Sequence, residues 1–220
     1  MARIARVVAA GLSHHITQRG NRRQQTFFSE ADYREYISLL AEWCKRCDVE
    51  IWSYCLMPNH VHVIAVPKSE ESLRKAIGEA HRRYTRYINF LKEWRGYLWQ
   101  GRFSSYPMDN AYLLAAARYI AFNPVRAGLA EKPWDYRWSS AAAHLAGKDD
   151  ELVKVFPLLE IAGGWQSFLS EDITDKEVNA LRQHERNGRP LGCEHFVGMV
   201  EGKLGRTFSL QKPGPKKKNG

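Results

Sequence analysis

The stretch that decides the fold is VEIWSYCLMPNHVHVIAV, residues Val49 to Val66. Its first half, VEIWSYCLM, is rich in β-branched and aromatic residues, which favours a strand. The dipeptide Pro58-Asn59 is a turn signal, and HVHVIAV then resumes the β pattern. The whole stretch therefore predicts two antiparallel strands joined as a hairpin.

Two histidines begin the second of these strands. Side chains alternate between the faces of a strand, so His60 and His62 point the same way, about 7 Å apart. The valines and alanine between and after them point to the opposite face and can enter a core. Paired imidazoles on one face can bind a metal ion, but they can equally be held by ordinary hydrogen bonds. Two ligands do not make a site, so a third would have to come from elsewhere in the chain.

The segments around the hairpin complete a recognisable order of elements. Ser29 is the expected N-cap of the first helix, and Pro124 is the expected stop of the last one. The predicted elements are a strand over 7–18, a basic loop over 19–25, a helix over 29–47, the hairpin, a helix over 69–94, a strand over 97–108 and a helix over 109–124. The order β-α-β-β-α-β, followed by one more helix, predicts an α+β fold of the ferredoxin-like type with an antiparallel sheet.

The character of the chain changes after about residue 147. We expect residues 1–147 to form one domain and residues 148–210 to form a small helical C-terminal extension. Residues 211–220 are basic and rich in proline and glycine, which predicts a disordered tail.

Charge and composition limit the classes of function. The 220 residues include 33 Lys and Arg against 24 Asp and Glu, a net charge of +9. This charge fits a polyanionic partner such as nucleic acid, and it fits a role in solubility alone equally well. No stretch approaches the roughly 18 apolar residues of a membrane span, and the N-terminus lacks a secretory cleavage pattern. The 4 cysteines are too few for a disulfide scaffold, so we expect a cytoplasmic protein without a membrane partner.

One cysteine pair raises a second hypothesis. Cys44 and Cys47 form a single CKRC motif inside a predicted helix, which is a weak zinc signal. A zinc-stabilised protein using His60, His62 and these cysteines remains an alternative, although a purely structural role for both thiols is favoured.

The helix over 109–124 carries two polar residues away from its apolar side. At 100° per residue, Tyr119 lies opposite the core stripe and Asn123 follows on the same face one turn later. Tyr112 shares that face, with Ala115 and Ala116 between, so the small residues could leave room for a ligand. The stripe expected to face the core is Leu113, Leu114, Ala117, Ile120 and Ala121.

Several short motifs together resemble one known family. MPNHVHVIA, LWQGRFSSYPM and ARYIAFNPVRAGL occur here in the order seen in the REP-associated tyrosine transposases, which belong to the single-tyrosine HUH transposases and nucleases. HITQRGNRRQ near the N-terminus and WDYRWSSAAAHLAG after the last motif are also similar, so the resemblance covers roughly residues 10–147. The region NGRPLGCEHFVGMVEGKLGR, with the basic tail, is similar to the C-terminal extension of longer members.

The resemblance implies a chemistry for particular residues. His60 and His62 match the pair that binds a divalent metal, expected to be Mg²⁺ or Mn²⁺, although nitrogen ligands would also suit zinc. Tyr119 matches the nucleophile, and Asn123 matches the place of a third, amide-bearing metal ligand. The implied enzyme is a transposase and single-strand DNA endonuclease that nicks REP-like hairpin DNA through a covalent 5′-phosphotyrosine intermediate. Such an enzyme would act in the cytoplasm at the nucleoid, with a monomer favoured and a homodimer as the alternative.

Basic and aromatic residues supply the expected DNA contacts. Arginines can clamp phosphates and aromatic rings can stack on unpaired bases, whereas the simpler alternatives are solvated charges and core aromatics. The DNA-binding residues proposed are Arg19, Arg22, Arg23, Arg82, Arg86, Trp99, Arg102, Phe103 and Arg126, with Arg83 on the same helix as Arg82. Lys216, Lys217 and Lys218 in the tail are expected to be nonspecific anchors.

A different class of function also fits the sequence. A domesticated relative could hold hairpin DNA or RNA without cutting it. The presence of His60, His62 and Tyr119 together favours the enzyme, because an inactive copy has no need of all three.

Overall fold

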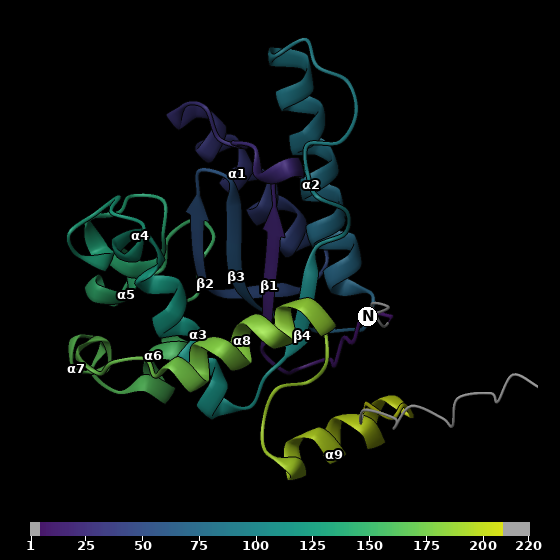
Figure 1. The fold of residues 1–220 in the computed structure, drawn as a ribbon, viewed down its shortest axis with the longest axis vertical. Coiled ribbons are helices and arrows are strands. Elements are labelled where there is room, and N and C mark those ends of the chain that lie inside the picture. The colour runs from purple at the N-terminus through teal and green to yellow at the C-terminus, as the bar shows by residue number, and fades with distance from the viewer. Residues whose placement is uncertain (1–4, 209–220) are drawn as a thin grey trace, which may run out of the picture.

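A four-stranded antiparallel sheet forms the centre of the molecule (Figure 1). The computed structural model describes residues 5–208. The strands are β1 (His14–Arg19), β2 (Val49–Met57), β3 (His60–Pro67) and β4 (Ser104–Pro107), in the spatial order β2-β3-β1-β4. This order and the connecting helices confirm the predicted α+β, ferredoxin-like fold.

The hairpin forms as the sequence predicts. β2 pairs antiparallel with β3, and Met57 and His60 face each other across the turn at Pro58-Asn59. β3 also pairs with β1, with His60 opposite Arg19 and His62 opposite Thr17. The strand that carries the two histidines is therefore central in the sheet, and its backbone is held on both sides.

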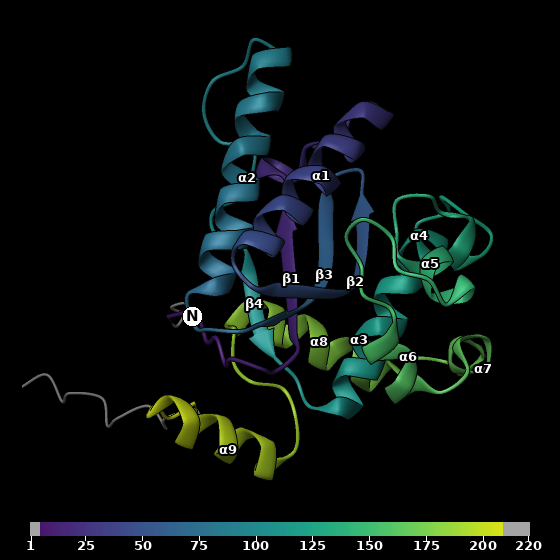
Figure 2. The ribbon, with the colours of Figure 1, turned by 180° about the vertical axis from the view of Figure 1, so that it is seen from behind.

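Helices α1 (Glu30–Arg46) and α2 (Ser72–Leu91) cover one face of the sheet (Figure 2). The predicted N-cap is confirmed, because the Ser29 side chain accepts from the Asp32 N–H and the Asp32 carboxylate accepts from the Ser29 N–H at 2.8 Å. The hairpin residues Val61, Val63 and Ala65 join the core on this side, as alternation requires. One side of α2 is fully buried there and comprises Leu73, Ile77, Ala80, Tyr84 and Ile88.

Helices α3 (Asn110–Ala121) and α8 (Asp175–Asn187) pack against the other face (Figure 1). Asp109 caps α3 by accepting from the Tyr112 N–H at 3.0 Å. Ile64 of β3, Tyr106 of β4 and Leu181 of α8 belong to the second core cluster on this side. His60 and His62 lie on the same side of β3 as Ile64, so they belong to the face shared with α3 and α8.

The remaining elements are short and surround this framework. They are η1 (Asn21–Arg23), α4 (Asn123–Arg126), η2 (Pro133–Asp135), α5 (Ala141–Ala146), α6 (Phe156–Ala162), α7 (Trp165–Ser170) and α9 (Glu194–Leu204). None of the helices within residues 5–208 is long and apolar enough to cross a membrane.

Three predicted boundaries are wrong. The first strand starts at His14 instead of residue 7, because Val7 and Ala9 pack in a separate small core with Phe196 and Val200 of the α9 region. The strand predicted over 97–108 shrinks to β4, and Trp99 makes only an isolated bridge to Gly20. The helix predicted to end at Pro124 ends at Ala121, and a separate turn, α4, begins at Asn123.

The segment expected to be a C-terminal extension contributes helix α8, which packs against the central sheet. α8 contacts α3, β4 and β1, all of which lie within residues 1–147. The division at residue 147 stays a prediction, and the tail over 211–220 lies outside the described residues.

Candidate functional site

The two histidines of β3 lie side by side on one face of the sheet. Their ring centroids are 5.0 Å apart and their planes are nearly perpendicular at 83°. His62 is buried and His60 is half-buried, so the pair sits at the margin of the core. This arrangement confirms the shared face that period-two alternation predicts.

Neighbouring groups orient the His60 ring. Its Nδ1 lies 2.6 Å from the Asn59 Oδ1. The Asn59 amide nitrogen donates to the Arg23 carbonyl at 3.1 Å, which fixes the carboxamide so that its oxygen faces the ring. The His60 Nδ1 must then donate its proton to this oxygen, and the lone pair of a neutral ring lies on Nε2.

His62 contacts a third histidine that the sequence analysis did not single out. The His62 Nδ1 lies 3.1 Å from the His15 Nε2, and the two rings stack at 5.3 Å. The His15 Nδ1 lies 2.8 Å from the hydroxyl of Tyr106, which donates to the Leu181 carbonyl of α8 at 3.1 Å. His15 and Tyr106 could have been found from the register of β1 and β4, since both lie on the face that carries His62.

Burial keeps the histidine pair neutral. Desolvation, together with the nearby charge of Arg19, lowers the pKa of His60 to about 4. Desolvation is also the largest cause that lowers the pKa of His62 well below its ordinary value, with His60 and His15 adding to it. Neutral imidazole is the form that binds metal ions, so the pair is in a binding-competent state at neutral pH.

Tyr119 of α3 lies against this pair. Its ring meets that of His62 edge to face, with centroids 5.7 Å apart and planes at 78°. The guanidinium of Arg126 lies 4.3 Å from the centroid of the Tyr119 ring, and one of its nitrogens donates to the Tyr119 carbonyl at 2.5 Å. Tertiary folding thus brings a phenol, a cation and two imidazoles together from β3, α3 and α4.

Asn123 starts α4, one turn after Tyr119. It is half-buried, and its amide nitrogen is buried without a hydrogen-bond partner in the described part of the chain. A rotation of the amide would put the oxygen in that place, and an amide oxygen is a metal ligand whereas an amide nitrogen is not. The unpartnered amide of Asn123 is therefore compatible with a role as a metal ligand.

The donor set fits a divalent cation. Two neutral imidazoles and one amide offer nitrogen and oxygen donors of the kind that Mn²⁺ accepts, while Mg²⁺ favours the oxygen. Within residues 5–208, no cluster of three or more His, Cys, Asp or Glu side chains could hold a metal. Cys44 and Cys47 lie on and next to α1, across the sheet from the histidines, so the structure does not support the zinc hypothesis.

The small residues of α3 do not leave space for a ligand. Ala115 and Ala116 are buried, and Tyr112 packs against the core cluster that includes Ile64 and Tyr106. The prediction of space for a ligand at these alanines is therefore wrong. The predicted core stripe is confirmed except at Leu114, which is only half-buried.

Some of the predicted DNA-binding arginines lie near the histidines. Arg19 ends β1 opposite His60, and Arg126 lies over Tyr119. Arg19 and Arg102 line an open polar groove of about 460 Å³ together with Arg186 of α8, which the sequence analysis missed. Thr17, the strand partner of His62, also lines this groove, which therefore leads toward the histidine pair.

Arg22 and Arg23 occupy the turn that follows β1. Both have left-handed backbone conformations, with φ of 52° and 62°, and Arg22 is exposed. This turn projects their backbone beyond the end of the strand that carries Arg19.

The other predicted DNA contacts are placed elsewhere. Arg82 and Arg86 are exposed on α2, across the sheet from His62, and Arg82 pairs with Glu79 at 2.6 Å. Trp99 and Phe103 are each only 6% exposed and belong to the core under α1 and α2. Their burial contradicts the expectation that these rings stack on bases, because no flat face is open to a nucleotide.

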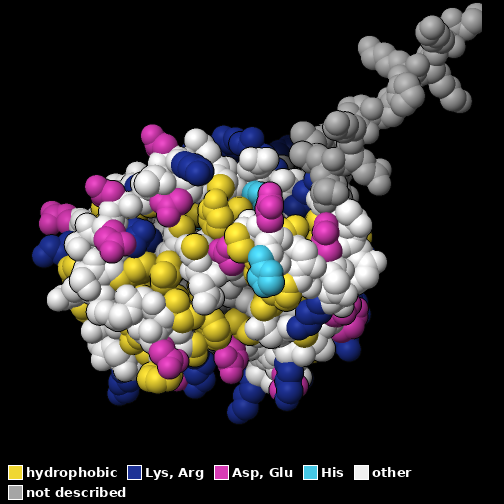
Figure 3. Space-filling view, turned by 90° about the horizontal axis from the view of Figure 1, so that it is seen from below, with side chains coloured by type: hydrophobic (Ala, Val, Ile, Leu, Met, Phe, Trp, Pro, Cys, Tyr) yellow, Lys and Arg dark blue, Asp and Glu magenta, His cyan; other side chains and the backbone are white. Residues whose placement is uncertain are grey.

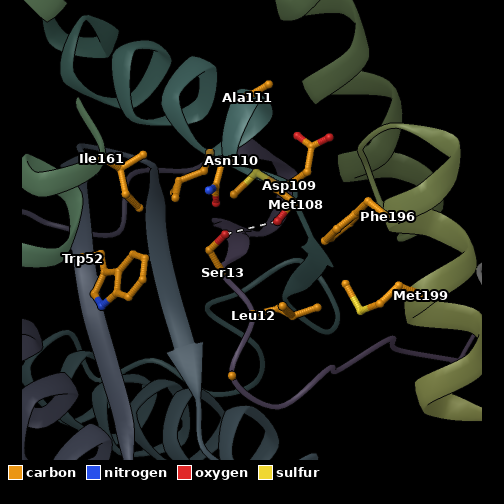
Figure 4. A pocket seen from close by; sticks show the side chains of 12 residues that line it. Leu12, Ser13, Trp52, Met108, Asp109, Asn110, Ala111, Ile161, Phe196 and Met199 are labelled. Atoms are coloured by element: carbon orange, nitrogen blue, oxygen red, sulfur yellow. Dashed lines mark hydrogen bonds between the residues drawn. The ribbon is translucent and has the colours of Figure 1, made fainter. Parts of the chain in front are cut away.

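A separate apolar groove lies at the other end of β1. Figure 3 shows hydrophobic side chains gathered on that face of the molecule, and Figure 4 shows the groove from close by. Trp52, Met108, Phe196 and Met199 are among its lining residues, and its volume is about 510 Å³. No histidine lines it, so it is distinct from the site around His62.

Comparisons with known proteins place these residues in context. The family model described as "Transposase IS200 like" matches residues 9–123, which include His60, His62, Tyr119 and Asn123. Among curated proteins, no sequence matches this chain.

Two solved structures align with this chain, and the first shares its fold. A REP-associated tyrosine transposase bound to a REP hairpin aligns over 80% of this chain and 94% of that chain, with 20% identity and a TM-score of 0.59. A Deinococcus radiodurans R1 protein described as a transposase aligns over 58% of this chain and 92% of that chain. Its identity is 18% and its TM-score is 0.38.

Proposed function

Because this chain belongs to the IS200-like transposase family, we propose that it nicks and rejoins single-stranded DNA through a covalent bond to Tyr119. The observation that carries the proposal is the contact of the Tyr119 ring with that of His62, at 5.7 Å between centroids. A nucleophile and a metal-binding pair must be adjacent to act on one phosphate, and these residues are distant in sequence.

His60, His62 and Asn123 are the residues proposed to hold the divalent metal, as Mg²⁺ or Mn²⁺. A bound ion would neutralise charge on a non-bridging phosphate oxygen and fix the phosphate in place. The chain supplies neutral rings, and the partner of the His60 Nδ1 directs the other nitrogen of that ring outward. The half-buried position of His60 keeps this edge of the site within reach of a DNA strand.

The Tyr119 oxygen would attack phosphorus, forming an O–P bond as the bond from phosphorus to the 3′ oxygen breaks. The products are a 5′-phosphotyrosine and a 3′-hydroxyl, with the phenol proton transferred through solvent to the leaving oxygen. Arg126 supplies positive charge beside the phenol ring, where negative charge gathers during phosphoryl transfer. Attack by a 3′-hydroxyl on the phosphotyrosine reverses the step and joins the strands.

The polar groove beside the histidines is the proposed path of the DNA strand. Arg19, Arg102 and Arg186 border it, so it offers cationic groups for successive phosphates. The related solved structure holds a REP hairpin, which makes a hairpin with a single-stranded flank the substrate to test first.

The test is a nicking assay on a labelled hairpin oligonucleotide with Mn²⁺ or Mg²⁺, and with a chelator. We expect metal-dependent cleavage of the single-stranded part, with protein attached to the 5′ end. Tyr119→Phe should bind the hairpin as tightly as the wild type yet form no adduct, because it lacks only the nucleophilic oxygen.

Tyr112→Phe is the matched control, since Tyr112 is a second half-buried tyrosine of α3. It should form the adduct normally. Adduct formation by Tyr119→Phe would refute the assignment of the nucleophile, and a wild type that binds without cutting would favour a non-cleaving hairpin-binding protein.

A further inference from the structure

We infer that a hydrogen-bonded relay from helix α8 sets the tautomer of His62, which makes the C-terminal part of the chain a component of the metal site. The relay runs from the Leu181 carbonyl through the Tyr106 hydroxyl and the His15 ring to the His62 Nδ1. The inference rests on the proposed function, because it concerns how His62 presents its other nitrogen to a metal.

The carbonyl at the end of the relay determines its direction. A carbonyl can only accept, and the Tyr106 oxygen lies 3.1 Å from the Leu181 oxygen, so this contact is favourable only if Tyr106 donates its proton there. The Tyr106 oxygen then has no proton left for His15. It accepts instead from the His15 Nδ1 at 2.8 Å.

The direction of hydrogen-bond donation at His15 determines which nitrogen of His62 carries the proton. Burial without an acidic partner keeps the His15 ring neutral, so a proton on Nδ1 leaves a lone pair on Nε2. That lone pair lies 3.1 Å from the His62 Nδ1, which must therefore carry a proton. A neutral His62 with a proton on Nδ1 has its lone pair on Nε2, which is the nitrogen left for a metal.

The opposite arrangement would leave the site unable to use His62. If Tyr106 donated to His15, the His15 Nε2 would donate to His62, and the His62 Nε2 would carry the remaining proton. The two oxygens of Tyr106 and Leu181 would then face each other with no proton between them. Only one of the two arrangements satisfies all three contacts.

α8 is held in the position that this relay needs. Ser104 and Tyr106 lie on one face of β4 and donate to the carbonyls of Glu185 and Leu181, which are one turn apart on α8. The Leu181 side chain is buried in the core beneath. α8 lies beyond residue 123, where the match to the family model ends, so this part of the site belongs to the chain outside that match.

Histidine tautomers can be measured directly in the full-length protein without metal. We expect long-range proton–nitrogen NMR of ¹⁵N-histidine-labelled protein at neutral pH to show His62 protonated on Nδ1. Tyr106→Phe removes the acceptor of the His15 proton, so His62 should shift toward the other tautomer. Removal of such an outer partner should weaken Mn²⁺ binding by about 10- to 100-fold in calorimetry.

Tyr36→Phe is a matched control. Tyr36 is a fully buried tyrosine whose hydroxyl contacts the buried His81 at 2.9 Å, in the core on the other face of the sheet. It should lower thermal stability much as Tyr106→Phe does, while the His62 tautomer and Mn²⁺ affinity stay unchanged. Equal Mn²⁺ affinity in the two variants would overturn the relay.

A second pair of variants separates the hydrogen bond that His15 makes to His62 from the packing of the His15 side chain. His15→Gln keeps an oxygen acceptor for the His62 Nδ1 and should retain most of the Mn²⁺ affinity, whereas His15→Leu should lose it. A wild-type His62 protonated on Nε2 would also overturn the relay. A wild type with the expected tautomer that binds no Mn²⁺ would instead count against the proposed function and leave the relay standing.

Discussion

Arg126 is the charged residue whose placement against Tyr119 the sequence did not reveal. Its guanidinium lies 4.3 Å from the centre of the Tyr119 ring and also donates a hydrogen bond to the Tyr119 backbone carbonyl. Phosphoryl transfer gathers negative charge on the oxygens around phosphorus, and a fixed cation beside the nucleophile stabilises that charge.

We therefore predict that Arg126→Met slows formation of the covalent adduct by about 100-fold, the scale of losing one stabilising group. Affinity for the hairpin should fall much less. Arg137→Met is the control, because Arg137 is also exposed and stacks on an aromatic ring, Trp138, at 5.0 Å. Single-turnover gel assays at saturating protein measure both, and equal rates for the two variants would exclude a role for Arg126 in the chemical step.

Among the elements, α1 is the one whose start the sequence defines most sharply. The Ser29 side chain and the Asp32 carboxylate exchange hydrogen bonds with each other's backbone N–H groups. Asp32 also accepts from the Phe28 N–H at 2.7 Å, so one buried carboxylate satisfies two of the donors at the helix start.

Ser29→Ala should lower the free energy of unfolding by about 1 kcal/mol, because it removes the N-cap acceptor. Ser38→Ala makes the same change at an exposed position inside α1. It should be neutral or raise the free energy of unfolding by a few tenths of a kcal/mol, since alanine is the better helix former. Urea unfolding followed by circular dichroism measures both, and a shift of the same sign in the two variants would contradict the capping role.

At the scale of the whole molecule, buried histidines tie stability to pH. Desolvation lowers the pKa of His14 to about 4 and of both His15 and His81 to about 3. In the unfolded chain these rings take up a proton near pH 6.5, whereas the folded protein keeps them neutral. The unfolded state therefore binds more protons below pH 6.5, and the stability present above that pH is lost as the pH falls toward 4.

Each such ring should make the free energy of unfolding fall by about 1.4 kcal/mol for each pH unit between pH 6 and 5. His81→Gln should reduce this slope of the free energy of unfolding against pH by about that amount. His195→Gln changes an exposed histidine of α9 and should leave it unaltered. Urea unfolding at pH 7.5, 6.0 and 5.0 supplies the comparison, and an unchanged slope for His81→Gln would show that His81 is protonated in the fold.

Local patterns determined much of this protein. β2 and β3, the cap of α1, the stripe of α2 and the common face of His60 and His62 follow from alternation, helical period and capping, which act between residues close in sequence. These features can be predicted without knowing which element packs against them across the core. The order of elements then limited the topology to the ferredoxin-like arrangement that the sheet shows.

Tertiary structure alone decided what surrounds the histidines. Tyr119 meets His62, Arg126 covers Tyr119, and α8 reaches β4 from beyond residue 147, all through contacts between segments distant in sequence. Trp99 and Phe103 were proposed to stack on bases, with a place in the core as the simpler alternative. They are buried, because aromatic residues suit a core as well as a base stack. A pattern in sequence fixes the face on which a side chain lies, but the packing of other elements fixes which neighbour it meets there.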